Sequence, residues 1–208
     1  MTPITAIFFD IGAVLLSNGW TEVERRQVAA AFDLDFAEFD QRHYQVIDAF
    51  DYGHISLQTY LDWAVFYKPR SFTPQDFEKE VQRIMTPIPE ALQIARELKE
   101  TGRYFMATLN NEPREFNDYR IQHFGLPELF SAFFSSCYLG VRKPQLEVYR
   151  KALAISQRRP EESLFIDDAP INIEAALALG MNAILYVGAD ELRTELEKLG
   201  LFLADHTH

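Results

Sequence analysis

The sequence predicts an α/β fold, in which a parallel sheet carries helices on both faces. Short apolar runs rich in β-branched and aromatic residues, which are typical of buried strands, alternate with segments of helical periodicity. A long helical stretch without a convincing strand separates the first apolar run from the others. Strands that alternate with helices pair in parallel and are covered by those helices. With 208 residues, 48% of them hydrophobic, the chain can bury a sizeable core.

The first strand is expected over residues 4–9, where an apolar run ends at Asp10. A helix is expected to begin after Thr21, which has the spacing of a capping box with Glu24. Further helices are indicated by apolar residues at helical spacing, namely Leu57, Tyr60, Leu61, Ala64, Phe77, Val81 and Ile84. The stretch after the first strand is therefore predicted to be helical.

Another helix start is predicted at Thr73, which precedes Pro74. The helical stretch is too long for an ordinary loop, so we assign residues 17–86 to an inserted helical unit. The core is then built from residues 1–16 and 87–208. We expect most of the polar aromatic residues of the insertion to pack between its helices: Trp20, His43, Tyr44, Tyr52, His54, Tyr60 and Trp63.

After the insertion, strands and helices alternate up to residue 200. The expected elements are a helix over 89–100, strands over 104–108, 133–137, 163–166 and 183–187, a helix over 171–179, and a last helix that Asp190 caps and Gly200 ends. Together with the first strand, these elements complete a single parallel sheet.

Charge and composition exclude several classes of function. The net charge of −11 argues against binding to nucleic acid or to an anionic membrane surface. No run approaches the roughly 20 apolar residues that a membrane span requires. We expect no secretory signal, because no basic region precedes the first apolar run. The single cysteine, Cys137, rules out an internal disulfide and fits a reducing, cytoplasmic location.

Polar residues stand where the predicted strands end. They are Asp10, Thr108, and the pair Asp167 and Asp168, and Lys143 lies in a turn-rich segment after another strand. Ligands of parallel sheets bind beyond the carboxyl ends of the strands, so these residues are expected to converge. Clustered carboxylates require a cation between them, and an all-oxygen set favours Mg²⁺. Such a site could bind a phosphate group and let an Asp10 oxygen attack its phosphorus.

Four segments carry a resemblance to a known family. FFDIGAVLL, MATLNN, GVRKPQLEVY and LFIDDAPINIEAA resemble, in order, the four motifs of the haloacid dehalogenase superfamily. The insertion is similar to the helical C1-type cap of subclass I, and the Asp-x-Gly of the first motif resembles the glucose-1-phosphatase-like and epoxide-hydrolase-N-terminal-like branch. The resemblance covers nearly the whole chain. It implies a three-layer Rossmann-like core and a Mg²⁺-dependent phosphatase of small phosphorylated metabolites.

The resemblance also implies a role for each motif residue. Asp10 matches the nucleophile, which forms an aspartyl-phosphate. The implied metal-binding set is Asp10, Gly12 through its carbonyl, Asp167 and Asp168; the implied phosphate-binding set is Thr108, Leu109, Asn110 and Lys143. Asn172 matches a polar helper near the metal. Catalysis is thus assigned to Asp10, Thr108 and Lys143.

Two positions depart from the family pattern. Gly12 stands where most family phosphatases have a second Asp, the general acid and base. Leaving groups that are weak bases need less acid help, which favours sugar 1-phosphates or acyl phosphates as substrates. Leu109 stands where relatives have Asn, so Asn110 or Asn111 is expected to take over its polar contacts. The segment 51–54 is expected to be the specificity loop, with His54 a candidate acid.

Three alternatives to the phosphatase remain at this point. A metal-independent 2-haloacid dehalogenase would use the same Asp10 on carbon, but the pair Asp167 and Asp168 argues against it. A weakened binding or regulatory protein is suggested by the missing carboxylate at Gly12. A phosphomutase would ordinarily need that carboxylate as well. The expected partner is a small phosphorylated metabolite, and the expected assembly is a monomer or a homodimer.

Overall fold

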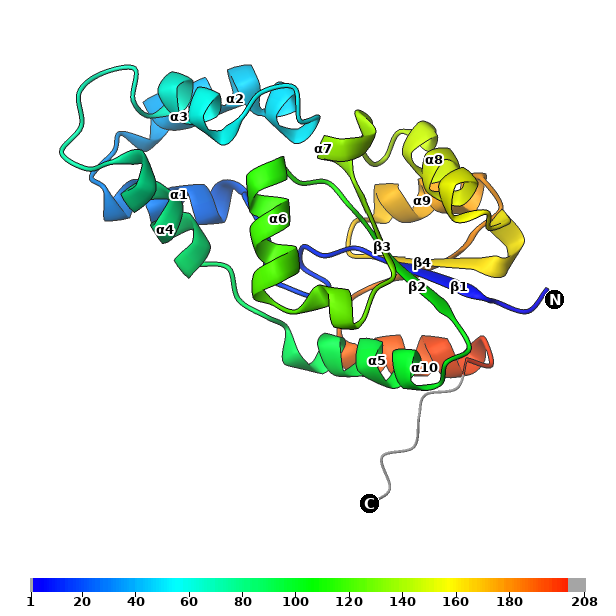
Figure 1. Ribbon diagram of the computed structural model, residues 1–208. Coiled ribbons are helices and arrows are strands. Elements are labelled where there is room, and N and C mark those ends of the chain that lie inside the picture. The colour runs from blue at the N-terminus through cyan, green and yellow to red at the C-terminus, as the bar shows by residue number, and fades with distance from the viewer. Residues whose placement is uncertain (1, 202–208) are drawn as a thin grey trace.

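The computed structural model describes residues 2–201, so the end of the predicted core segment, residues 202–208, lies outside the described residues. Its centre is a five-stranded sheet with the order β3-β2-β1-β4-β5, in which every paired strand is parallel (Figure 1). The strands are β1 (Ala6–Phe9), β2 (Phe105–Asn110), β3 (Ala132–Ser135), β4 (Ser163–Asp167) and β5 (Asn182–Leu185). The predicted α/β fold is confirmed.

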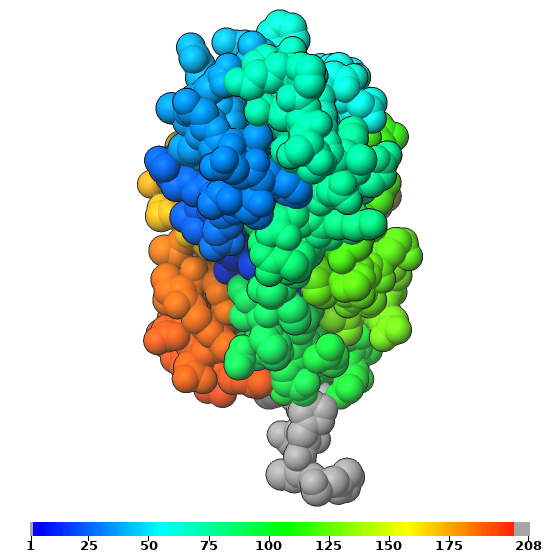
Figure 2. Space-filling view, turned by 90° about the vertical axis from the view of Figure 1, so that its left-hand side faces the viewer, coloured from blue at the N-terminus to red at the C-terminus, as the bar shows by residue number. Residues whose placement is uncertain are grey.

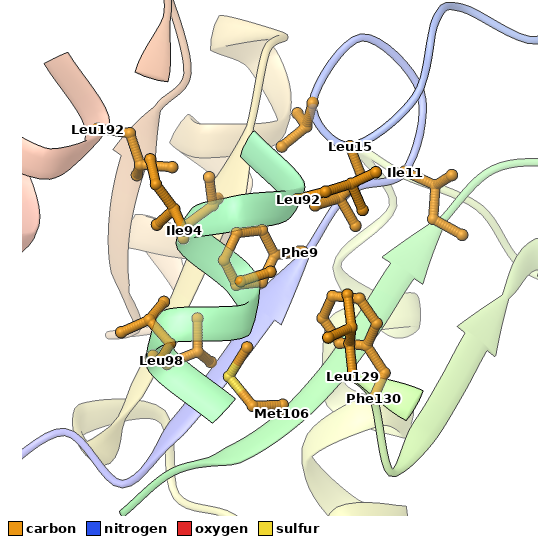
Figure 3. Packing of buried hydrophobic residues seen from close by; sticks show 14 of the residues in the cluster. Phe9, Ile11, Leu15, Leu92, Ile94, Leu98, Met106, Leu129, Phe130 and Leu192 are labelled. Atoms are coloured by element: carbon orange, nitrogen blue, oxygen red, sulfur yellow. The ribbon is translucent and has the colours of Figure 1, made fainter. Parts of the chain in front are cut away.

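Helices cover both faces of the sheet because the strands are apolar on both sides. In β1, Ile7 and Phe9 pack into the core cluster that includes residues of α5 (Pro89–Glu100) and α10 (Ala189–Lys198). Figure 3 shows Phe9 beneath α5 in this cluster. The alternate residues, Ala6 and Phe8, pack toward α8 (Leu146–Ser156) and α9 (Pro170–Ala178). This makes three layers.

The predicted helical insertion is present between β1 and β2. It contains α1 (Glu22–Ala31), α2 (Phe36–Asp51), α3 (Leu57–Ala64) and α4 (Pro74–Arg83), which share a core of aromatic residues. As predicted, the Glu24 side chain accepts a hydrogen bond from the Thr21 backbone N–H, and the Thr73 hydroxyl accepts one from Asp76 N–H. Phe116 of α6 (Arg114–His123) joins this cluster from the core side. We call residues 17–86 the cap.

Two linkers connect the cap to the core, and they run side by side. Ser17 N–H donates to the Thr86 carbonyl over 2.7 Å, and Ile88 N–H donates to the Leu15 carbonyl over 2.9 Å. An antiparallel bridge between Leu16 and Pro87 lies between these bonds. The predicted domain boundaries fall at this paired crossing, and they remain predictions. Figure 2 shows the cap stacked above the core.

Several element boundaries were wrong. β1 begins at Ala6 instead of residue 4, and β5 ends at Leu185 instead of residue 187. β2 continues to Asn110 instead of ending at residue 108. The strand predicted over 133–137 ends at Ser135, and Cys137 lies in the short helix α7 (Ser136–Leu139). Asp190 does not cap α10. It lies in the first turn of the helix, and Gly188 occupies the N-cap position. The remaining short helices are η1 (Leu126–Glu128) and η2 (Pro160–Glu162). Within residues 2–201, no helix is both long and apolar enough to cross a membrane.

Candidate active site

Four charged residues meet at the carboxyl end of the sheet. Asp10 directly follows β1, and Asp167 and Asp168 stand at the end of the neighbouring β4. Lys143 reaches this edge from the loop between α7 and α8, where it precedes a cis peptide bond to Pro144. The structure therefore brings together the three predicted carboxylates and the predicted lysine.

Lys143 is buried between two of the carboxylates. Its Nζ lies 2.8 Å from Asp10 Oδ1 and 2.6 Å from Asp167 Oδ2. The Asp10 Oδ1 atom also accepts a hydrogen bond from Ile11 N–H over 2.8 Å. Such charge-assisted bonds fix the position of the Asp10 carboxylate, and they leave its Oδ2 atom without a hydrogen-bond donor among the described residues.

Burial and charge oppose each other at this cluster. Burial raises the pKa of Asp10 to about 7, although Lys143 opposes the shift and Asp167 adds to it. Burial by itself would lower the pKa of Lys143, but Asp10 and Asp167 outweigh it and raise the pKa of the ammonium. Burial and Asp167 also raise the pKa of Asp168. The site therefore favours an added positive charge.

Two asparagines hold the charged residues in place. The Asn111 side chain accepts from Lys143 N–H over 2.9 Å and donates to the Lys143 carbonyl over 3.0 Å. Asn172 Nδ2 donates to Asp167 Oδ1 over 2.9 Å, and Ala169 N–H donates to the same oxygen over 2.9 Å. The predicted helper Asn172 thus lies beside the predicted metal residues. Asn111 was considered only as a substitute for Leu109.

The carboxylates fit a divalent cation. One oxygen each of Asp10, Asp167 and Asp168 lies within 4.8 Å of the others. Asp167 is fully buried and its oxygens already serve Lys143 and Asn172, whereas Asp168 is exposed and lines the cavity. Hard oxygen donors of this kind suit Mg²⁺. Gly12 lines the cavity as well.

The other predicted phosphate-binding residues do not line this cavity. Thr108 is fully buried inside β2, and its hydroxyl has no hydrogen-bond partner among the described residues. Leu109 packs in the core beneath α8 and α9. Asn110 donates to Asn117 and accepts from Ser135. Because β2 runs two residues further than predicted, the strand-end position belongs to Asn111, which lines the cavity in their place.

A cavity of about 440 Å³ opens between the strand ends and the cap. Its core wall includes Asp10, Gly12, Asn111, Glu112, Arg142, Lys143, Asp168 and Asn172; its cap wall includes Trp20, Arg25, His43, Tyr44, Ile47, Asp48 and Asp51. The cap wall was not predicted in this detail, because its residues come from α1, α2 and the linker before them, and no sequence motif marks them.

The segment predicted as the specificity loop joins the cap to the core. Asp51 lines the cavity and pairs with Arg142 over 3.0 Å. The Gly53 Cα packs against the Cys137 carbonyl, where an added Cβ would come within 2.2 Å of the oxygen. His54, the candidate acid, is exposed and does not line the cavity. His43 of the cap lines it instead.

Gly12 leaves open space where most family phosphatases have a carboxylate. A Cβ built on Gly12 would meet only Asn18 Oδ1, at an ordinary contact distance of 3.7 Å. The fold around Gly12 therefore accommodates a Cβ atom, and crowding at this position does not require a glycine.

These features agree with the family comparison. The sequence profile of the haloacid dehalogenase-like hydrolases matches residues 4–180. The chain belongs to this family of hydrolases, as the four motifs predicted. It is therefore an enzyme, and it has the fold of the family.

Relatives with assigned names include phosphatases. The chain is 27% identical to the sesquiterpene phosphatase of Aspergillus oryzae over 186 residues, which cover 86% of this chain and 88% of that protein. It is 37% identical to the flavin mononucleotide hydrolase of Arabidopsis thaliana over 68 residues, which cover 33% of this chain but only 28% of that relative.

Solved structures share the fold at low identity. A family enzyme of Bacteroides thetaiotaomicron, in complex with magnesium and inorganic phosphate, superposes with a TM-score of 0.73 at 18% identity and covers 88% of this chain and 93% of that chain. The L-2-haloacid dehalogenase of Xanthobacter autotrophicus superposes with a TM-score of 0.62 at 18% identity, covering 94% and 83%. These likenesses confirm the fold.

Proposed function

We propose that this hydrolase is a Mg²⁺-dependent phosphatase of small phosphorylated metabolites that acts through an aspartyl-phosphate on Asp10. The observation that carries the proposal is the position of the Lys143 ammonium, 2.8 Å from Asp10 and 2.6 Å from Asp167. A buried cation beside a carboxylate nucleophile is suited to an anionic substrate. The names of two relatives, a sesquiterpene phosphatase and a flavin mononucleotide hydrolase, support the same substrate class.

The residues of the site divide the reaction between them. An Asp10 carboxylate oxygen attacks phosphorus, the bond from phosphorus to the leaving oxygen breaks, and water then cleaves the acyl phosphate to release phosphate. Lys143 neutralises charge on the phosphoryl oxygens. Asp10, Asp168 and the Gly12 carbonyl would hold Mg²⁺, with Asp167 beside them. When bound, Mg²⁺ supplies positive charge that reduces repulsion between the carboxylates and phosphate.

The substrate class follows from Gly12, the position at which most family phosphatases have a second Asp. Gly12 cannot protonate the leaving oxygen, so leaving groups that are weak bases react most readily. Sugar 1-phosphates and acyl phosphates are of this kind. We therefore place sugar 1-phosphates first among candidate substrates, with the cap over the cavity excluding bulk water.

The proposal is tested by phosphate release from a panel of esters, with Mg²⁺ or with EDTA. The panel holds glucose 1-phosphate, acetyl phosphate, a nucleotide, flavin mononucleotide and a terpenyl phosphate. We expect release with Mg²⁺, loss with EDTA, and loss in Asp10→Asn. Asp190→Asn, an exposed carboxylate in α10, is the matched control. No release from any member in the presence of Mg²⁺ would contradict the proposal.

The alternatives have less support from the site. A dehalogenase attacks carbon and has no need for three carboxylates within 4.8 Å of one another; halide release from 2-chloropropionate with EDTA present would favour it. Gly12 supports a regulatory protein, because it lacks the carboxylate of the general acid. The other charged groups that the four motifs predict are present, and they argue against it: Asp10, Lys143, Asp167 and Asp168. A phosphomutase would also ordinarily need the missing carboxylate. The monomer or homodimer and the cytoplasmic location remain predictions.

A further inference from the structure

The cap wall of the cavity carries a histidine whose two ring nitrogens have different surroundings. His43 lies in α2, is buried, and lines the cavity. Its Nδ1 lies 2.8 Å from the Tyr60 hydroxyl. Within residues 2–201, Nε2 has no hydrogen-bond partner. Nε2 is therefore the nitrogen that remains for a bound molecule.

Tyr60 determines which nitrogen of His43 carries the proton. The indole Nε1–H of Trp20 donates to the Tyr60 hydroxyl oxygen over 2.9 Å. For the single hydroxyl proton of Tyr60, the described part of the chain then offers one acceptor, His43 Nδ1. A neutral histidine whose Nδ1 accepts a hydrogen bond carries its proton on Nε2. Trp20 and Tyr60 thus make Nε2–H a donor.

The ring of His43 is uncharged near neutral pH. Burial, together with the charge of Arg25, lowers the pKa of His43 to about 3. A neutral Nε2–H has no special attraction for an anion and pairs well with a hydroxyl or carbonyl oxygen.

The cations around the cavity are already paired with carboxylates. The pairs are Arg25 with Asp40, Arg120 with Glu112, Arg142 with Asp48 and Asp51, and Lys143 with Asp10 and Asp167. Of these cations, only Lys143 lies at the predicted phosphate position. A substrate with a second anionic group near the cap would be repelled by Asp48 and Asp51. Among the described residues of this wall, no unpaired cation would offset that repulsion.

We propose that His43 is a specificity-determining residue, which donates a hydrogen bond from Nε2–H to an uncharged oxygen of the leaving group. Tyr60 acts through His43 as a positioning residue. The inference rests on the proposed phosphatase function and narrows its substrates to phosphate esters of uncharged, oxygen-rich alcohols. A hydrocarbon leaving group would leave Nε2–H unpaired in a buried wall, which disfavours its binding.

The kinetic test compares two esters in His43→Phe, which keeps an aromatic ring but removes both nitrogens. Glucose 1-phosphate offers hydroxyl oxygens, and phenyl phosphate offers none beyond the phosphate. We expect the ratio of kcat/KM for glucose 1-phosphate to that for phenyl phosphate to fall about tenfold, which corresponds to about 1.4 kcal/mol. His123→Phe, at an exposed residue of α6 outside the cavity, should keep the wild-type ratio.

An unchanged ratio in His43→Phe, or an equal fall in both variants, would overturn the proposal. The second test is ¹⁵N NMR of the histidine side chains. We expect the Nε2–H tautomer of His43 in the wild type and a mixture of tautomers in Tyr60→Phe. The Nδ1–H tautomer in the wild type would overturn the assignment. Release of phosphate by the wild type from another member of the panel but from neither of these esters would overturn the narrowed substrate class. No release from any member would overturn the phosphatase function as well.

Discussion

The Asn111 side chain binds both the N–H and the carbonyl of Lys143. Its Oδ1 accepts over 2.9 Å and its Nδ2 donates over 3.0 Å. Asn111 follows β2, whereas Lys143 belongs to the loop before α8, 32 residues further along the chain. The asparagine therefore ties the lysine loop to the end of the central sheet, and it places the ammonium beside Asp10.

Replacing this asparagine should displace the lysine. Asn111→Leu keeps the branching at Cγ but removes both hydrogen bonds, and we expect kcat/KM for phosphate release to fall about 10- to 100-fold. Asn182→Leu is the matched control, because the Asn182 amide also donates to backbone carbonyls, at the start of β5. It should lower the free energy of unfolding without this loss of kcat/KM. Equal kinetic losses would show that Asn111 acts only through stability.

A carboxylate at position 12 should change the choice of leaving group. A Cβ on Gly12 has room, so Gly12→Asp adds an acid at a position where the first side-chain atom meets no close contact. We expect kcat for an alkyl phosphate, relative to an aryl phosphate, to rise at least about tenfold over the same ratio in Gly12→Ala, since positioned acids contribute about 10²–10⁴-fold. If this ratio of kcat values were the same in Gly12→Asp and Gly12→Ala, the claim that Gly12 deprives the enzyme of a general acid would be contradicted.

Much of the fold could be predicted because its signals are local. The apolar run before Asp10, the capping residue Thr73 and the alternation after residue 89 each depend on neighbouring residues only. The error at β2 is different. The strand was predicted to end at residue 108, but pairing with β3 extends it through Asn110. That extension moves the strand end from Thr108 to Asn111, and the sequence contains no local sign of it.

The site could be predicted only in part for the same reason. Asp10, Lys143 and Asp167 carry motif positions, and the structure brings them together. Arg25 and His43 reach the cavity because the cap folds over the core, which depends on packing between helices far apart in sequence. The whole loop 51–54 was expected to face the cavity. Of its residues only Asp51 lines the cavity, and His54, the candidate acid, does not.

The contact between the cap and α7 should tolerate no side chain at Gly53. Gly53 has a φ of +70° and faces the Cys137 carbonyl, whereas Gly102 has a φ of +65° and no atom within 4 Å of an added Cβ. Gly102→Ala isolates the backbone cost, about 1–2 kcal/mol. We expect Gly53→Ala to lower the free energy of unfolding by about 1–3 kcal/mol more, as measured by urea denaturation. Equal losses would mean that the cap is not held at this point.

The buried His43 should make stability depend on pH. Its pKa of about 3 in the folded chain lies below its value of roughly 6.5 in the unfolded chain, so its contribution is complete above pH 6.5 and declines as the pH falls toward 3. Between pH 7 and 5.5, the stability of the wild type should decline by about 1 kcal/mol relative to His43→Gln. Urea denaturation at both pH values measures this difference. Parallel behaviour of the two proteins would mean that His43 titrates normally when folded.

The most direct test of the account is whether Asp10 carries the phosphoryl group during turnover. The enzyme is mixed with Mg²⁺ and a substrate from the panel, quenched with acid within one turnover, and digested for mass spectrometry. We predict a phosphoryl group on the peptide that contains Asp10, and none in Asp10→Asn, which releases no phosphate. Phosphate release by a protein that never carries the group on Asp10, or by Asp10→Asn at the wild-type rate, would contradict the account.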